Sequence, residues 1–395
     1  MKVLHVLNAV SGGSAYSTFE LIEQLKKQGI DSYLVCEKNG TQARRDEIKK
    51  MLGGKVIFLP LYRANDKIRT VLWKRPLLEM KLSLGTLRGH KFQAQLAQIV
   101  RDEKIDIVHT STAVNTEGAI LAQKMGLPHI WHIRELVGDD KHYQFGNHQK
   151  WVQTIEKQSA MIVANSNVTY DCIAPFMADT NKICTIPNAI DVQKFKPKTH
   201  TNSIDKKIVV GMVASLDARW KNHTLFVKIA GKLKTLSNVE FRIYGKIPPT
   251  TDAYWLELNA LKKSLGLSDE QFKFMGHGTK PEVFWAEIDI MVHPNRFESF
   301  GRVFVEAMAA AIPVIGLNEG GALQMVRDGY NGFLVPENDI AYICDKIKLL
   351  TEDSALRQQL GNAGRVTVEQ DFDMPILGKR IKALYEQILH SHSHK

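Results

Sequence analysis

The sequence predicts an α/β protein of two doubly wound domains that face each other across a cleft. Short apolar runs alternate with amphipathic helical stretches along the chain, and the alternation starts again after a polar segment at 196–207. At 395 residues the chain is also too long for one ordinary hydrophobic core and suits two α/β domains. We therefore expect domains at 1–195 and 205–370, followed by a C-terminal helix at 371–395.

The first domain is predicted from short runs that are apolar on both faces, as the strands of a parallel sheet are. These runs are Val3–Leu7, Tyr33–Cys36, Val56–Leu59, Ile105–His109, His129–Ile133, Met161–Ala164 and Ile183–Ile186. An amphipathic helix is predicted at 16–28 and ends at Gly29. Gly12 and Gly13 lie between the first strand and this helix, so their backbone can approach a phosphate, although a simple tight turn explains them equally well.

The second domain repeats the same pattern. Its predicted strands are Ile208–Val213, Phe241–Tyr244, Phe272–Met275, Ile288–Val292, Pro313–Gly316 and Gly332–Val335. Near the C-terminus, apolar residues recur at helical spacing and form one stripe: Ile376, Leu377, Ile381, Leu384, Tyr385 and Ile388. A helix with such a stripe must pack against another surface, and we expect it to cross back onto the first domain.

Composition excludes several classes of protein. Hydrophobic residues make up 44% of the chain and charged residues 24%, which is an ordinary balance for a globular protein. No apolar run reaches the roughly 20 residues that a membrane-spanning helix needs. The cysteines at 36, 172, 184 and 344 lack the spacing of a metal site, and scattered thiols are typical of the reducing cytoplasm. We therefore expect a cytoplasmic protein.

The net charge of +10 has a dense contribution from residues 63–101, where Lys and Arg alternate with leucines, Trp73 and Met80. This composition is typical of a helix that rests on anionic lipid, and equally of a solvated helix pair that covers one domain. A peripheral position on the inner face of the cytoplasmic membrane therefore stays open. We expect no nucleic-acid partner, because no helix-turn-helix, zinc or RNA-binding signature accompanies the charge.

The strongest chemical signal is a pair of glutamates, Glu298 and Glu306, that flank a strand-to-helix turn. Such turns line the crevice where α/β sheets bind ligands. The amides of Phe300 and Gly301 at the helix start can hold phosphate or sugar hydroxyls. Glu298 can accept hydrogen bonds from hydroxyls of a sugar, and the two oxygens of Glu306 match the vicinal diol of a ribose.

The segment from His293 to Pro336 resembles the carboxyl domain of glycosyltransferase family 4, the group 1 glycosyltransferases, with its Glu-x7-Glu motif. The similarity extends to Gly12–Gly13, to the strand-end histidines His109 and His132, and to the segment Ile186–Asp191. This resemblance implies the GT-B fold, with two Rossmann-like domains, and transfer of a sugar with retention of its anomeric configuration. It also implies that no bound metal or other cofactor is needed.

Two loops of the second domain resemble the family's phosphate and sugar loops. In Ala214–Asn222, Lys221 matches the motif lysine, whereas Ser215 replaces the motif arginine, so we expect Arg219 to supply the missing charge unless it is merely exposed to solvent. The second loop contains Gly320 and Gly321, and Gln324 stands where a glutamate is usual. The sequence therefore predicts donor binding by both loops, with Arg219 and Lys221 stabilising the departing diphosphate.

His132 matches the family's active-site histidine, and we expect it to contact donor or acceptor; a packed core histidine is the other interpretation. The Asp-x-Asp triplet Asp371–Asp373, which could suggest a metal site, precedes the terminal helix, where Asp373 is expected to cap it. The resemblance suggests a front-face substitution in which the leaving phosphate helps to deprotonate the acceptor.

The resulting prediction is a retaining hexosyl- or related glycosyltransferase that moves a sugar from a UDP- or GDP-sugar to a saccharide or lipid-linked acceptor in cell-surface polysaccharide or glycoconjugate synthesis. Two alternatives stay open. A non-hydrolysing epimerase would process a nucleotide sugar without an acceptor, and an inert binding partner of an active transferase would process nothing.

Overall fold

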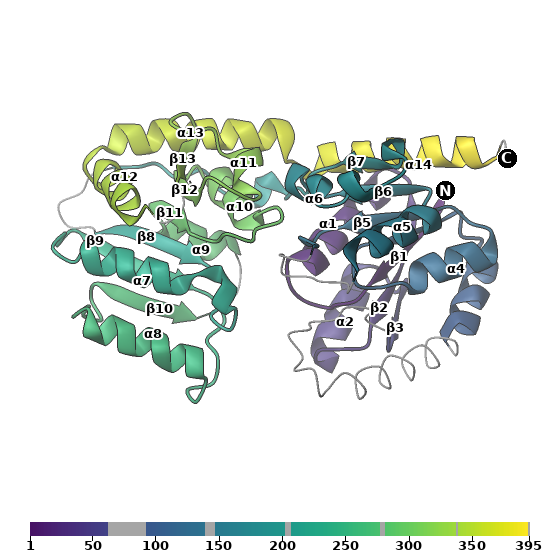
Figure 1. Cartoon of the computed structure of the whole chain (residues 1–395), viewed down its shortest axis with the longest axis horizontal. Helices are drawn as coiled ribbons and strands as arrows, with labels where there is room; N and C mark the ends of the chain where they lie inside the picture. The colour runs from purple at the N-terminus through teal and green to yellow at the C-terminus, as the bar shows by residue number, and fades with distance from the viewer. Residues whose placement is uncertain (62–91, 139–146, 202–206, 277–280, 337–338, 394–395) are drawn as a thin grey trace. The chain divides into compact units, whose positions relative to one another are not determined.

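The computed structural model describes residues 1–61, 92–138, 147–201, 207–276, 281–336 and 339–393 (Figure 1). Their contacts divide the chain into two compact units, one formed by Met1–Ala189 with Met374–Lys395 and the other by Ile190–Asp373. The division falls after Ala189, whereas we predicted a first domain that ends at 195. Residues near 198 belong to the second unit because Lys198 pairs with Asp289 at 2.8 Å and its amine also donates to the carbonyl of Ile288.

Parallel strands form the sheet of the first unit in the order β3-β2-β1-β4-β5-β6-β7. Their bounds are Lys2–Leu7 for β1, Asp31–Glu37 for β2, Val56–Leu59 for β3, Ile107–Thr110 for β4, His129–Ile133 for β5, Met161–Ala164 for β6 and Ile183–Thr185 for β7. Each predicted run of this domain is a strand, with ends that shift by a residue or two. The strand order reverses between β1 and β4, and α/β sheets bind ligands outside the carboxyl ends of strands at such a point.

The described helices of the first unit are α1 (Gly13–Lys27), α2 (Gln42–Met51), α4 (Glu117–Met125), α5 (His148–Gln158), α6 (Asn167–Asp171) and α14 (Met374–Ser393). The apolar stripe predicted near the C-terminus lies on the buried face of α14, which is yellow in Figure 1, except that Ile376 is only partly buried. Ile381 and Tyr385 of this helix share a hydrophobic cluster with Leu21 and Leu25 of α1. The C-terminal helix therefore packs within the first unit.

Parallel strands also form the sheet of the second unit, in the order β10-β9-β8-β11-β12-β13. They are β8 (Ile208–Val213), β9 (Val239–Tyr244), β10 (Phe272–Gly276), β11 (Ile290–His293), β12 (Val314–Leu317) and β13 (Gly332–Val335). The strand order reverses between β8 and β11. The two sheets thus repeat one topology, as the recurrence of the sequence pattern predicts.

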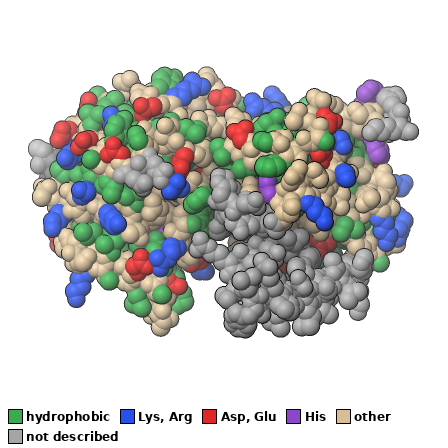
Figure 2. Space-filling model, in the orientation of Figure 1, with side chains coloured by type: hydrophobic (Ala, Val, Ile, Leu, Met, Phe, Trp, Pro, Cys, Tyr) green, Lys and Arg blue, Asp and Glu red, His purple; other side chains and the backbone are tan. Residues whose placement is uncertain are grey.

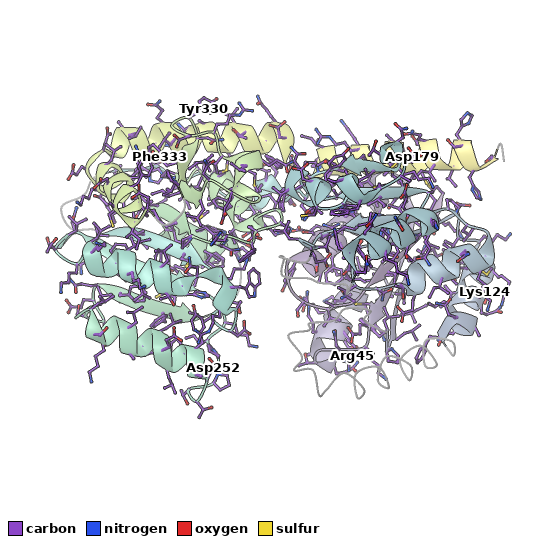
Figure 3. The ribbon with its side chains drawn as sticks, in the orientation of Figure 1. Arg45, Lys124, Asp179, Asp252, Tyr330 and Phe333 are labelled. Atoms are coloured by element: carbon purple, nitrogen blue, oxygen red, sulfur yellow. The ribbon has the colours of Figure 1, made fainter. Side chains whose placement is uncertain are left out.

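The described helices of the second unit are α7 (His223–Lys232), α8 (Ala253–Ser264), α9 (Pro281–Glu287), α10 (Arg302–Ala309), α11 (Ala322–Met325), α12 (Ile340–Glu352) and α13 (Ser354–Asp371). Local capping sets where several of them begin. Asp252, labelled in Figure 3, accepts hydrogen bonds from the amides of Tyr254 and Trp255 and so starts α8.

The basic stretch at 63–101 predicts a possible membrane contact. Residues 62–91 of that stretch lie outside the described residues, and residues 92–101 are helical. In the described part of the chain, no helix is long and apolar enough to cross a bilayer. On the face shown in Figure 2, the Lys and Arg side chains of the second unit are interspersed with Asp and Glu.

Candidate active site

The loops that follow β8 and β11 carry the main polar cluster of the second unit. They leave the sheet at the point where the strand order reverses. The loop after β8 ends in a 3₁₀ turn, Arg219–Lys221, and the loop after β11 contains Asn295 and Glu298. Asn222 joins the two loops, because its side-chain amide donates to the carbonyl of Pro294 at 3.0 Å.

Glu298 is the centre of this cluster, and three donors converge on its Oε2 atom. The Lys221 amine lies at 2.6 Å, the Asn295 amide at 2.8 Å and the His293 Nε2 atom at 3.2 Å. Burial alone would raise the pKa of the Glu298 carboxyl, but Lys221 and His293 outweigh it and hold the pKa well below its ordinary range. Glu298 is therefore a carboxylate, fixed in one orientation, beside a lysine ammonium.

The helix start after Glu298 depends on glycine. Gly301 has φ 86° and precedes α10, a backbone conformation that other residues rarely adopt. Gly321 permits the next loop to pack closely, since a Cβ there would lie 2.2 Å from the carbonyl oxygen of Phe300. The Gly321 amide also donates to the Glu298 carbonyl at 2.8 Å. The structure thus brings together Glu298, Phe300, Gly301, Gly320 and Gly321, all predicted donor-binding residues.

Glu306 occupies a different environment from Glu298. It is buried on α10, where its Oε2 atom accepts a hydrogen bond from the Trp285 indole at 3.1 Å and its Oε1 atom one from Arg302 at 2.7 Å. A carboxylate has about four acceptor positions, so a diol can still bind beside these two donors. Trp285 and Arg302 orient the carboxylate.

Arg219 contacts residues of α8. Its guanidinium is exposed, pairs with Glu257 of α8 at 2.6 Å and lies 4.4 Å from the ring centroid of Tyr254. Ser215, which stands in place of the motif arginine, donates to Asp217 at 2.8 Å.

Sequence reasoning missed several members of this site. His293 and Asn295 contact Glu298. Lys246, two residues after the end of β9, lies 3.4 Å from Asp217 in the loop after β8. Lys246 is a second cation at the carboxyl edge of this sheet. The signal that points to it is the Tyr-Gly-Lys sequence at the end of a predicted strand.

In the first unit, the predicted residues lie at the carboxyl ends of the central strands. Gly12 precedes α1 directly, and Gly13 is the first residue of that helix. His109 of β4 and His132 of β5 are both buried, and the His109 Nε2 atom lies 3.2 Å from the His132 Nδ1 atom. His132 Nε2 has no hydrogen-bond partner among the described residues.

Two features bear on metal binding. Among the described residues, no group of three or more His, Cys, Asp or Glu side chains is arranged to hold a metal ion. Asp373, from the Asp-x-Asp triplet, accepts a hydrogen bond from the amide of Val192 at 3.3 Å. Asp373 thus contacts the backbone of the segment at the start of the second unit.

Comparison with known families covers most of the chain. The family model described as "Glycosyltransferase Family 4" matches residues 11–194, and the one described as "Glycosyl transferases group 1" matches residues 193–367. The matched ranges together include His109, His132 and the loops that follow β8 and β11, and they leave out Asp373 and the C-terminal helix.

Two bacterial relatives illustrate the similarity. The UDP-Gal:alpha-D-GlcNAc-diphosphoundecaprenol alpha-1,3-galactosyltransferase of Escherichia coli is 24% identical over 407 residues, which span 98% of this chain and 96% of that protein. The capsular polysaccharide biosynthesis glycosyltransferase CapM of Staphylococcus aureus is 26% identical over 244 residues. That match spans 58% of this chain and 62% of CapM.

Solved structures share the fold at low sequence identity. The structure of Anabaena HepE in complex with UDP has a TM-score of 0.78 and 20% identity, and covers 98% of this chain and all of that one. A glycosyltransferase from Rickettsia africae has a TM-score of 0.79 at 20% identity, with 98% of each chain covered. The chain therefore belongs to the group 1 glycosyltransferases of family 4 and has their two-domain, Rossmann-like GT-B fold.

Proposed function

We propose that this glycosyltransferase moves a hexosyl or related group from a UDP- or GDP-sugar to a saccharide or glycolipid acceptor, with retention of the anomeric configuration. The observation that supports this most directly is the pairing of Lys221 with Glu298, a cation and an oriented carboxylate at one sheet edge. The names of the relatives are in keeping with it, since the E. coli protein is a UDP-galactose-dependent transferase and CapM acts in capsular polysaccharide biosynthesis.

In the proposed reaction, the bond between the anomeric carbon and the diphosphate oxygen breaks while the acceptor oxygen bonds to the same face of that carbon. The acceptor proton passes to the departing phosphate oxygen. Lys221 stabilises the negative charge that grows on the diphosphate, and Glu298 accepts hydrogen bonds from sugar hydroxyls. Glu306 holds the ribose diol. We propose no metal or other cofactor for these steps.

The test begins with ligand binding to the full-length protein. A thermal-shift panel with UDP, GDP, ADP and their sugars should single out one base, because ligand at 100 times its dissociation constant adds about 2.7 kcal/mol of stability. NMR of the product formed with that donor should then show the donor's anomeric configuration. An inverted product overturns the retaining assignment, and formation of an epimer without any acceptor favours the epimerase.

An inert partner of an active transferase is the remaining alternative. It predicts a nucleotide shift in the thermal panel and no product with any donor and acceptor pair. The Lys221–Glu298 contact argues against this alternative, because a partly buried ion pair is costly to desolvate and an inert partner has no departing diphosphate for Lys221 to stabilise. Turnover that is unchanged by EDTA is the expected outcome for metal-independent transfer.

We further propose that the enzyme works in the cytoplasm, at the inner face of the membrane, as part of cell-surface polysaccharide or glycoconjugate synthesis. The support is the basic and apolar composition of residues 63–101. Binding to anionic vesicles should fall with added salt, and replacement of Lys74, Arg75 and Lys81 by Gln should weaken it by roughly 1 kcal/mol per charge. Equal binding to neutral vesicles contradicts this location.

A further inference from the structure

Consecutive hydrogen bonds between buried side chains connect the C-terminal helix to His132. The Tyr385 hydroxyl of α14 lies 2.5 Å from His109 Nδ1, and His109 Nε2 lies 3.2 Å from His132 Nδ1. Arg134, directly after β5, brings an Nη2 atom to 3.4 Å from the same His132 nitrogen. All four side chains are buried within the first unit.

The direction of these hydrogen bonds follows from which atoms can donate. An arginine guanidinium carries only donors, so the His132 Nδ1 atom that faces it must be an acceptor. His109 must then donate from Nε2, and in a neutral imidazole this leaves Nδ1 as the acceptor for the Tyr385 hydroxyl. The opposite direction would place a His132 N–H against an N–H of Arg134.

The charge states agree with this order. Burial, together with the neighbouring histidines and Arg134, holds the pKa of His109 well below its ordinary value, and burial with Arg134 and His5 does the same for His132. Burial raises the pKa of the Tyr385 hydroxyl. Both imidazoles are therefore neutral and the phenol keeps its proton. His5 of β1, whose ring centroid lies 5.2 Å from that of His109, is neutral too, with a pKa lowered to about 3 by burial and by Arg134.

The consequence concerns the other nitrogen of His132. When Nδ1 is the acceptor, the single proton of the neutral ring resides on Nε2. This N–H is buried and has no partner among the described residues, an arrangement that destabilises a folded protein. A buried donor that the fold orients but leaves unpaired is suited to bind an oxygen of a ligand.

We propose that Tyr385 and His109 are positioning residues that, together with Arg134, hold His132 as a neutral hydrogen-bond donor, with its Nε2 proton available to a substrate oxygen, so that His132 does not act as a base. The identity of that oxygen rests on the proposed sugar transfer, whereas the tautomer is a property of the free protein. The C-terminal helix thereby contributes to the active site through Tyr385.

The tautomer is measured on the full-length protein labelled with ¹⁵N-histidine. Long-range ¹H–¹⁵N correlation spectra distinguish a protonated ring nitrogen from an unprotonated one, and spectra of His132→Gln and His109→Gln assign the signals. We expect both histidines to be neutral at pH 7 with the proton on Nε2. A proton on His132 Nδ1, or a charged His132 ring, overturns the proposal even if sugar transfer is observed.

Substitutions test the positioning role. Tyr385→Phe removes the hydroxyl that donates to His109 Nδ1, so the His109 signals should become a mixture of tautomers, while Arg134 still keeps His132 Nδ1 an acceptor. Because His132 then loses a fixed hydrogen-bond partner, kcat/KM should fall about 3- to 10-fold, with kcat more affected than KM. The matched control is Tyr33→Phe, which removes a tyrosine hydroxyl bonded to Glu103 at 2.6 Å in the same unit. It should change neither the spectra nor turnover. Wild-type spectra and turnover in Tyr385→Phe contradict the proposal.

A conservative replacement separates positioning from folding. Glutamine at position 109 offers one acceptor for Tyr385 and one donor for His132, as the neutral imidazole does, whereas leucine offers neither. His109→Gln should therefore retain most of the turnover that His109→Leu loses, at matched thermal stability. Equal loss in both variants refutes the role of the hydrogen bonds. If the protein transfers no sugar, the spectra still decide the tautomer, and only the proposed function fails.

Discussion

Removing the Lys221 amine is the sharpest test of the cluster around Glu298. Methionine is unbranched and of similar length to lysine but carries no charge. Lys221→Met therefore leaves the Glu298 carboxylate with His293 and Asn295 as its side-chain partners among the described residues. Breaking a fully buried ion pair costs about 3–5 kcal/mol. The side chains of Lys221 and Glu298 are still 18% and 15% exposed, so we expect a smaller loss of about 2–3 kcal/mol in the free energy of unfolding.

The loss should depend on pH with a definite sign. The pKa of Glu298 is lower in the folded protein than in the unfolded chain, where a glutamate titrates near 4.3. Its contribution to stability is therefore complete above about pH 4.3 and is lost as the pH falls through the folded pKa. Lys221→Met removes the main cause of that low pKa, so its destabilisation should be full at pH 7 and should shrink below about pH 4.3.

A double-mutant cycle measures the pair itself. Urea unfolding of the wild type, Lys221→Met, Glu298→Gln and the double variant should give a coupling energy of about 2 kcal/mol, since each single variant leaves one charge unpaired. The double variant should recover stability but not sugar transfer, because both groups act on the donor. If the losses of unfolding free energy in the two single variants add up to that of the double variant within about 0.5 kcal/mol, Lys221 and Glu298 do not interact as this ion pair requires.

The remaining predictions concern other parts of the chain. Glu306→Ala should weaken nucleotide and nucleotide-sugar binding alike by about 1.5–3 kcal/mol, because it removes a charged acceptor, and unchanged affinity in calorimetry would exclude the ribose role. Arg219→Ala should raise the activation free energy of transfer by about 2–4 kcal/mol, comparable to loss of one oxyanion donor; steady-state turnover equal to the wild type would show that Arg219 is a surface residue and that the charge comes from elsewhere. Acid should destabilise the fold, since the pKa of His5 is lowered to about 3 and the unfolded chain takes up a proton below about pH 6.5. The contribution of His5 to stability is thus full above pH 6.5 and is lost as the pH falls toward 3. His5→Gln should reduce the slope of the unfolding free energy against pH by about 1.3 kcal/mol per pH unit between pH 4 and 6. A variant with the wild-type slope would show that His5 is already charged in the folded protein.

The strands were predictable because a buried parallel strand is apolar on both faces, and that pattern is local. Errors are confined to strand ends. The run Ile105–His109, for example, corresponds to β4 at Ile107–Thr110, because Lys104 adopts a positive φ and the Asp106 amide donates to the carbonyl of Lys2 before the ladder with β1 begins. Strand ends depend on the neighbouring strand, which a local pattern does not contain.

The candidate site was predictable where its residues fall within one motif. Glu298, Gly301 and Glu306 lie within a single turn and helix, so their spacing alone indicates a ligand site. Their partners come from other segments: Lys221 lies 77 positions from Glu298, and Trp285 precedes Glu306 by 21. Nothing in the local sequence specifies that Arg219 would turn toward Glu257 while Lys221 turns toward Glu298.

The sequence by itself determined the fold class, the repeated order of strands and helices, the apolar stripe of α14 and the motif that carries both glutamates. Each of these follows from periodicity or spacing within a few turns of chain. Only the tertiary structure decided which polar groups meet. The hydrogen bond between His109 and Tyr385 joins residues 276 positions apart. It forms because the apolar face of α14 packs against α1 and places Tyr385 in the same core cluster as Ile107 of β4. A hydroxyl buried there is stable only when it is hydrogen-bonded.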